Sequence, residues 1–181
     1  MTTIPSIKLI WDLYVVSRSQ VWELRAEVLD CLAGRVEKTD KIDSYVHLQS
    51  DEVRDMFDRY LDEMDKLIIL DLFTALEGHV RADFDDRVRQ RKRDSLSKSY
   101  RLIEKSGNNQ GRTPFEDLFV SWKEHRSACG SYVGRIRGLW HFRNWLAHGR
   151  WWVIKKGPMP DVNNVKRSVE GVLNCLGIPF F

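Results

Sequence analysis

Residues Leu67–Leu76 read LIILDLFTAL, an apolar run that is interrupted only by Asp71 and Thr74. The run lies inside a longer pattern, from Met56 to Phe84, in which apolar residues recur at helical spacing. A helix that is apolar on nearly all sides is usually buried. We therefore expect a central buried helix, around which the rest of the chain packs.

The chain before this run also has a helical pattern. Apolar residues recur through Val21–Leu32, and Gly34 offers a C-terminal stop because glycine readily adopts the left-handed conformation. Ile7–Val16 has no clear period, and we interpret it as helix as well. Ser50 is the expected N-cap of the central helix, since a serine hydroxyl accepts hydrogen bonds from the free N–H groups of a first turn.

Further helices are expected after the central one. The sequence TPFE is a capping box with proline at the first helical position, and an aspartate N-cap and a glycine C-cap bound the last helix. Residues 94–105 either extend the central helix or form a helix of their own. The remaining expected helices cover residues 114 to about 126, 132 to about 149, and 161–177.

No long segment alternates with period two, so strands are not expected. The fold class is therefore all-α, a single helical bundle of about five helices. We expect one domain over residues 1–181, with a core bundle over residues 50–177 and an N-terminal helical region over residues 1–49.

Cysteine usage and hydropathy bear on the compartment. Cys31, Cys129 and Cys175 are odd in number, widely spaced and in no CxxC arrangement, which predicts reduced thiols rather than a disulfide framework or a zinc site. The N-terminus does not resemble a signal peptide, and no apolar run is long enough to span a bilayer. We therefore expect a cytoplasmic protein that does not enter a membrane.

Charge is unevenly distributed along the chain. Residues 1–80 hold 9 Lys and Arg against 16 Asp and Glu, whereas residues 81–156 hold 18 against 8. A segregated positive field attracts polyanions such as RNA. For the run Arg87–Arg93 alone we favour a different interpretation, an exposed helix face partly neutralised by Asp83, Asp85 and Asp86.

The candidate chemistry lies in FRNWLAHGRWW, residues Phe142–Trp152. Residues four apart share a helix face, so Asn144 is placed to orient the His148 imidazole. Arg143 offers a rigid fork of donors to phosphate oxygens, and histidine exchanges protons near neutral pH. A simpler explanation also exists, because a histidine in the last turn of a helix is favoured by the helix dipole alone.

The run RNWLAHG resembles the signature of the HEPN superfamily, small all-α domains whose motif is an arginine and a histidine separated by four to six residues, commonly with a polar residue after the arginine. Here these positions are Arg143, Asn144 and His148. FTALEGHVRADF, residues Phe73–Phe84, is similar to the buried HEPN helix in which an aromatic residue and a glutamate recur. The RiboL-PSP-like HEPN proteins are the subgroup we suggest.

This resemblance implies a metal-independent endoribonuclease of a toxin–antitoxin or antiphage (abortive infection) system, which uses no cofactor and no metal. It implies a homodimer in which two motifs face each other, and RNA as substrate. A nucleotidyltransferase-like antitoxin is the implied partner. His148 would act as acid and base, Asn144 would assist it, and Arg143 would stabilise the phosphate during 2′-hydroxyl attack.

Other residues have supporting or binding roles in this hypothesis. Glu77 either pairs with an arginine such as Arg143 or faces solvent, since an unpaired buried carboxylate is costly. His141 is a second candidate to enter the cleft. The residues expected to bind RNA are Arg135, Arg137, Arg150 and Trp151; tryptophans at this spacing also serve as core or dimer contacts.

Two other classes of function remain open at this point. The first is a catalytically inert HEPN-type dimer that binds RNA, a nucleotide or a partner protein through the same cleft. The second is a helical adaptor in which the aromatic surface matters and the charges do not. Salt dependence separates the adaptor from the others, because polyanion binding weakens steeply with ionic strength.

Overall fold

A computed structural model describes residues 4–106, 115–148 and 159–180. Within these ranges the chain is all-α, as predicted, and has no strand. Six α-helices are present rather than about five, because residues 95–106 form a helix of their own. The helices are α1 (Ile7–Leu32), α2 (Ser50–Arg89), α3 (Ser95–Ser106), α4 (Phe115–His125), α5 (Gly130–Ala147) and α6 (Val162–Leu176), with 3₁₀ turns at Asp43–Tyr45 and Ser127–Cys129.

The chain divides into two compact units, and the division falls within α2. One unit is Lys8–Ile68; the other runs from Ile69 onward and includes the N-terminal residues up to Ile7. The boundary between the units therefore differs from the boundary at residue 50 that the sequence pattern suggested. The expectation of one domain over residues 1–181 stays a prediction.

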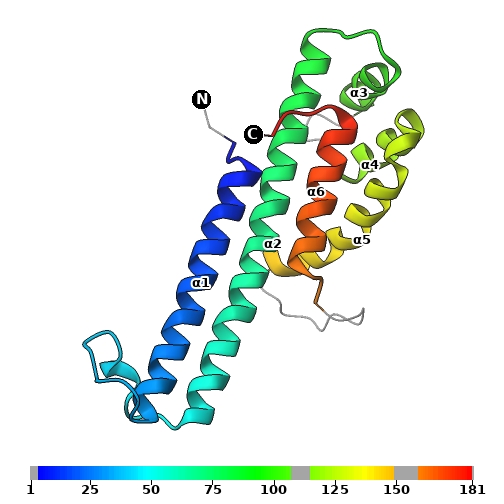
Figure 1. Cartoon of the computed structure of the whole chain (residues 1–181). Helices are drawn as coiled ribbons and strands as arrows, with labels where there is room; N and C mark the ends of the chain where they lie inside the picture. The colour runs from blue at the N-terminus through cyan, green and yellow to red at the C-terminus, as the bar shows by residue number, and fades with distance from the viewer. Residues whose placement is uncertain (1–3, 107–114, 149–158, 181) are drawn as a thin grey trace. The chain divides into compact units, whose positions relative to one another are not determined.

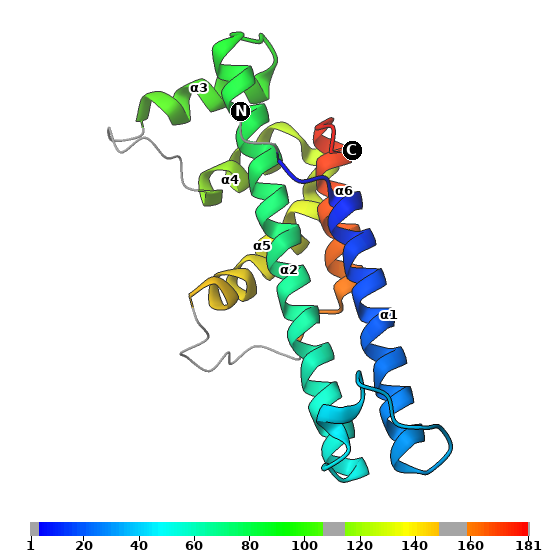
Figure 2. The same ribbon diagram turned by 90° about the vertical axis from the view of Figure 1, so that its left-hand side faces the viewer.

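The unit Lys8–Ile68 is a helical hairpin. α1 lies alongside the first part of α2 in both views (Figures 1 and 2). Its small core joins Val28, Ile42, Val53 and Phe57, each at most 2% exposed. Arg18 donates to Asp65 across the hairpin. Burial of these four side chains stabilises the hairpin, at about 1.5–3 kcal/mol for each large apolar group.

The second unit is built on the later part of α2. Ile69, Leu72, Phe73, Leu76 and Val80 are fully buried, so this part of α2 is the central helix that the sequence predicts. Leu67 differs from that expectation and is 55% exposed. α4 contacts both α3 and α5, and α5 contacts α6, to complete this unit.

Helix ends follow the sequence signals closely. Asp161 caps α6 by accepting a hydrogen bond from the Asn164 N–H at 2.8 Å, and Gly177 ends that helix at φ 70°. Gly34, at φ 71°, follows the end of α1. The expected cap of α2 is wrong by one residue, because Gln49 rather than Ser50 provides the carbonyl that accepts the first hydrogen bond, from Val53. Thr113 and Pro114 lie outside the described residues.

The prediction of reduced thiols is wrong for two of the three cysteines. Cys129 and Cys175 form a disulfide that joins the start of α5 to the end of α6, whereas Cys31 is free. The pairing is 46 residues apart in sequence, and such pairings cannot be deduced from spacing. Among the helices that the structure describes, none combines the length and apolarity needed to cross a membrane.

Candidate functional site

Arg143, Asn144 and His148 lie on the last turns of α5 and at its end. The helix is anchored by the buried side chains of Val133, Ile136, Trp140 and Leu146. α5 ends at Ala147, and His148 is its C-cap, whose backbone N–H donates to the Asn144 carbonyl at 3.0 Å. The His148 side chain is exposed. This end of α5 therefore carries both an exposed imidazole and a half-buried arginine.

Glu77 of α2 holds the Arg143 guanidinium. Arg143 Nη2 donates to Glu77 Oε2 at 3.1 Å, and the two side chains are 20% and 12% exposed. Of the two alternatives left open for Glu77, pairing is therefore the one found. The other carboxylate oxygen accepts two hydrogen bonds from Arg81, at 3.0 and 2.8 Å. One carboxylate thus holds two guanidinium groups, and the three residues together carry a net positive charge.

Trp140 supports Arg143 from the same helix. The guanidinium carbon of Arg143 lies 5.0 Å from the centroid of the Trp140 ring, a cation–π contact. The ring is itself fixed, since it stacks on Phe115 at 4.4 Å and its Nε1 donates to Glu116 at 2.8 Å. Arg143 Nε is buried without a hydrogen-bond partner among the described residues. The guanidinium is therefore held in place while its hydrogen-bonding capacity is only partly used.

The expected contact between Asn144 and His148 differs from the one found. Asn144 Oδ1 accepts from Arg143 Nη1 at 3.2 Å, and within the described part of the chain no hydrogen bond joins the Asn144 side chain to the imidazole. The physical reason is that His148 is the C-cap, with φ −98° and ψ 21°, so its side chain no longer follows the helical spacing that the expectation assumed. Asn144 therefore orients Arg143.

The other predicted residues are scattered. Arg135, Arg137 and His141 are exposed on α5, and no described contact joins them to Arg143. Arg150 and Trp151 lie outside the described residues. Sequence reasoning missed Arg81 and Trp140, although each carries a simple signal: Arg81 follows Glu77 by one helical turn, and Trp140 precedes Arg143 by one turn.

The run Arg87–Arg93 is partly neutralised, as the sequence suggested, but Arg87 is buried and does not lie on an exposed helix face. Arg87 pairs with Asp83 at 2.6 Å, while Arg89 and Lys92 pair with Asp86 at 3.2 and 2.9 Å. Asp85 is not among the partners recorded for these three cations. No group of three His, Cys, Asp or Glu side chains gathers as a metal would need within the ranges that the structure describes.

Comparisons with protein-family models, curated proteins and solved structures find no match for this chain. The resemblance to HEPN proteins therefore rests on the motif residues of the sequence alone and stays an expectation.

Proposed function

We propose that the protein is a metal-independent endoribonuclease, with Arg143 as the phosphate ligand and His148 as the proton-transfer group. The observation that carries this proposal is the fixed position of Arg143, between Glu77 and the ring of Trp140, at the helix end where His148 is exposed. Cleavage of a phosphate ester by an internal hydroxyl requires a preorganised cation and an accessible proton-transfer group, and this helix end supplies both.

The proposed reaction is attack by a ribose 2′-hydroxyl on its neighbouring phosphorus. The new bond joins the 2′-oxygen to phosphorus, and the bond from phosphorus to the 5′-oxygen breaks. His148 accepts the 2′-hydroxyl proton, and in a homodimer the second copy's His148 gives a proton to the leaving 5′-oxygen. The products are a 2′,3′-cyclic phosphate and a 5′-hydroxyl. Arg143 stabilises the negative charge that develops on the phosphoryl oxygens.

The biological setting proposed with this activity is a toxin–antitoxin or antiphage system. Its support is the HEPN resemblance of residues 143–148 and 73–84, which also implies RNA as substrate, a homodimer and a nucleotidyltransferase-like antitoxin as partner. A toxic ribonuclease needs a neutralising partner, and the net positive charge of Arg81, Glu77 and Arg143 is a suitable target for an acidic surface.

One observation favours the second candidate, a catalytically inert HEPN-type dimer that binds RNA, a nucleotide or a partner protein. Asn144 bonds to Arg143, and among the described residues the imidazole of His148 has no orienting hydrogen bond of the kind that a general base ordinarily has. In this candidate the same arginines bind an anion, and the position of the imidazole has no consequence.

Cleavage of total cellular RNA by the purified protein in EDTA separates the two candidates. Wild type should cut to cyclic-phosphate ends, and His148→Ala should lower the rate by about 10²–10⁴-fold, the usual contribution of a general acid–base group. His125→Ala is the matched control, because His125 ends α4 and has no role in the proposal. Absence of cleavage by the wild type would exclude the ribonuclease and leave the binding protein. Equal cleavage by wild type and His148→Ala would exclude His148 as the proton-transfer group.

A further inference from the structure

α5 and α6 are held tightly together at one end. The disulfide Cys129–Cys175 joins them there. About one turn further along each helix, the ring of Tyr132 lies against Gly171, where an added Cβ would come within 2.3 Å of the ring. Only glycine at position 171 permits this approach. The two helices are therefore clamped at the start of α5 and the end of α6.

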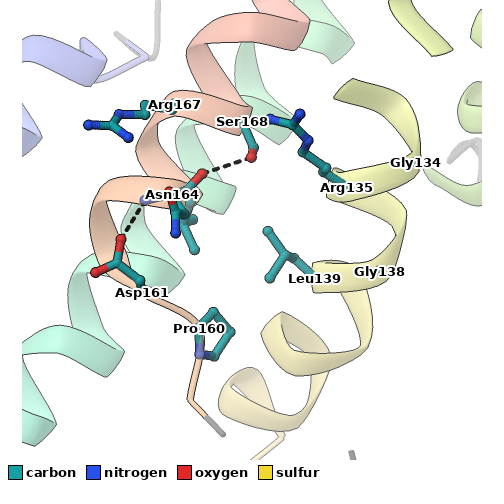
Figure 3. A pocket seen from close by; sticks show the side chains of 10 residues that line it. Gly134, Arg135, Gly138, Leu139, Pro160, Asp161, Asn164, Arg167 and Ser168 are labelled. Atoms are coloured by element: carbon teal, nitrogen blue, oxygen red, sulfur yellow. Dashed lines mark hydrogen bonds between the residues drawn. The ribbon is translucent and has the colours of Figure 1, made fainter. Parts of the chain in front are cut away.

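Toward the opposite end of the same helix pair a groove opens, with a volume of about 550 Å³. Figure 3 shows the groove between α5 and α6, with Leu139 and Pro160 pointing into the space between the helices. On the α5 side, Gly134 and Gly138 contribute bare backbone, and a Cβ added at either position would meet nothing within 4 Å. This size falls in the range of about 300–1,000 Å³ typical of small-molecule sites.

The groove contains one directed cation. Arg135 extends from α5 toward Ser168 of α6 (Figure 3). Its guanidinium contacts the Tyr132 ring at 5.8 Å, and it forms no ion pair with any carboxylate of the described residues. The two other charged residues of the lining are directed elsewhere: in Figure 3 Arg167 points away from α5, and the Asp161 carboxylate is engaged as the cap of α6.

We propose that this groove binds a small organic anion, consisting of an apolar body and a single carboxylate, sulfonate or phosphate group. The apolar body would lie between Leu139, Pro160 and the glycine backbone, and the anionic group would reach Arg135. Mostly apolar walls with a few polar groups are the usual make-up of a ligand site, and Asn164 and Ser168 supply polar groups here besides Arg135. An arginine with no carboxylate partner in the described part of the chain supplies the charge complementarity that selects an anion over a neutral compound.

This site is separate from the Arg143 site and does not rest on the proposed ribonuclease. Ile136 and Trp140 are buried on the side of α5 that faces the core, and Trp140 contacts Arg143. Gly134 and Gly138 are exposed and line the groove. Failure of one proposal therefore leaves the other unaffected.

The test uses two fluorescent probes with the same ring system. 8-Anilinonaphthalene-1-sulfonate carries one sulfonate, and N-phenyl-1-naphthylamine carries none. Arg135→Gln should weaken binding of the sulfonate by about tenfold, the value of one charge-assisted hydrogen bond, and should change binding of the neutral probe by less than twofold. Arg137→Gln is the matched control, an exposed arginine of α5 outside the groove lining, and should leave both probes within twofold.

A second variant tests the position of the apolar body. Gly138→Leu fills the groove from α5, and both probes should lose binding while the thermal unfolding curve followed by circular dichroism remains cooperative. Loss of sulfonate affinity in Arg137→Gln equal to that in Arg135→Gln would overturn the proposal, as would unchanged binding in a folded Gly138→Leu. Absence of sulfonate binding to the wild type would overturn it equally.

Discussion

Arg87 and Arg143 both lie in the unit that begins at Ile69, and carboxylates hold both, yet their surroundings differ. Arg87 Nε donates to Asp83 at 2.6 Å, and its Nη1 lies 3.3 Å from both Asp94 and Ser97. Its side chain is 10% exposed. Among the described residues Arg143 has one carboxylate partner, Glu77, which it shares with Arg81. Its side chain is 20% exposed, and its buried Nε has no partner within the same ranges.

The difference separates a structural arginine from a candidate functional one. The donors of Arg87 are directed at two carboxylates and a hydroxyl, and the cluster joins the end of α2 to the start of α3. Arg143 hydrogen-bonds to one carboxylate and one amide oxygen, and its side chain is more exposed, at 20% against 10%. A guanidinium that binds an external anion must be held in place and must still have N–H donors without a partner in the protein. A fully paired guanidinium has no donor left for a ligand.

Replacing Arg87 tests the structural half of this comparison and should have the largest effect. Arg87→Met leaves the Asp83 and Asp94 carboxylates without their main cation, and removal of one partner from a buried ion pair costs about 3–5 kcal/mol. Urea unfolding followed by circular dichroism measures the loss. A loss below about 1 kcal/mol would mean that the cluster is no more structural than a surface ion pair.

Replacing Arg143 by lysine tests the functional half. Lysine keeps the charge but lacks the planar fork, so binding of two phosphoryl oxygens is lost. RNA cleavage should fall by about 10²-fold, the cost of one oxyanion donor, while the free energy of unfolding changes by less than about 1 kcal/mol. Arg54→Lys, at an exposed arginine of α2 that has no part in the proposal, is the control and should cleave at the wild-type rate. A large loss of stability in Arg143→Lys would place Arg143 in the same class as Arg87.

Much of the framework could be predicted from the sequence because its signals are local. The cap at Asp161 and the stop at Gly177 depend on one or two residues and on backbone conformation, and both were found where expected. The buried run on α2 was also identified from its apolar pattern, and the structure confirms it: five of its residues are completely inaccessible to solvent. Leu67 was missed because its exposure depends on which neighbours pack against α2, and spacing does not contain that information.

The candidate site was harder to predict, because its contacts link distant segments. Glu77 and Arg143 are 66 residues apart, and the sequence allowed their pairing without choosing it over a solvent-facing glutamate. The prediction that Cys129 and Cys175 are reduced was wrong for the same reason, because their disulfide joins segments that are 46 residues apart in the chain. The groove between α5 and α6 left almost no signal, since Gly134 and Gly138 define it by having no side chain.

Glu77 tests whether one shared carboxylate positions both arginines. Glu77→Gln removes the negative charge between Arg81 and Arg143, and we expect a loss of about 2 kcal/mol in the free energy of unfolding, as for other charged hydrogen bonds. Chemical denaturation measures it. Glu116→Gln, which alters the carboxylate that accepts from Trp140, is the matched control with a smaller loss expected. Equal losses in the two variants would mean that Glu77 adds nothing as a charge.

The smallest effect concerns pH. Burial raises the pKa of Asp94, but the hydrogen bonds from Ser97 and the charges of Arg87 and Arg126 outweigh burial, so the pKa lies below its ordinary value of 3.8. The ionised carboxyl therefore stabilises the folded state above pH 3.8, and this stabilisation disappears as the pH falls through the lower folded-state pKa. Asp94→Asn should be less stable than wild type by a constant amount near neutral pH, and the difference should shrink below pH 3.8.

Asp83 has the opposite effect on the pH dependence of stability, because burial raises its pKa. Asp83 is present in both proteins, however, so its direct contribution cancels in the difference between them. Urea unfolding at a series of pH values checks this; a difference that stays constant into the acid range would show that Asp94 acts as a hydrogen-bond acceptor for Ser97 and not as the counter-charge of Arg87.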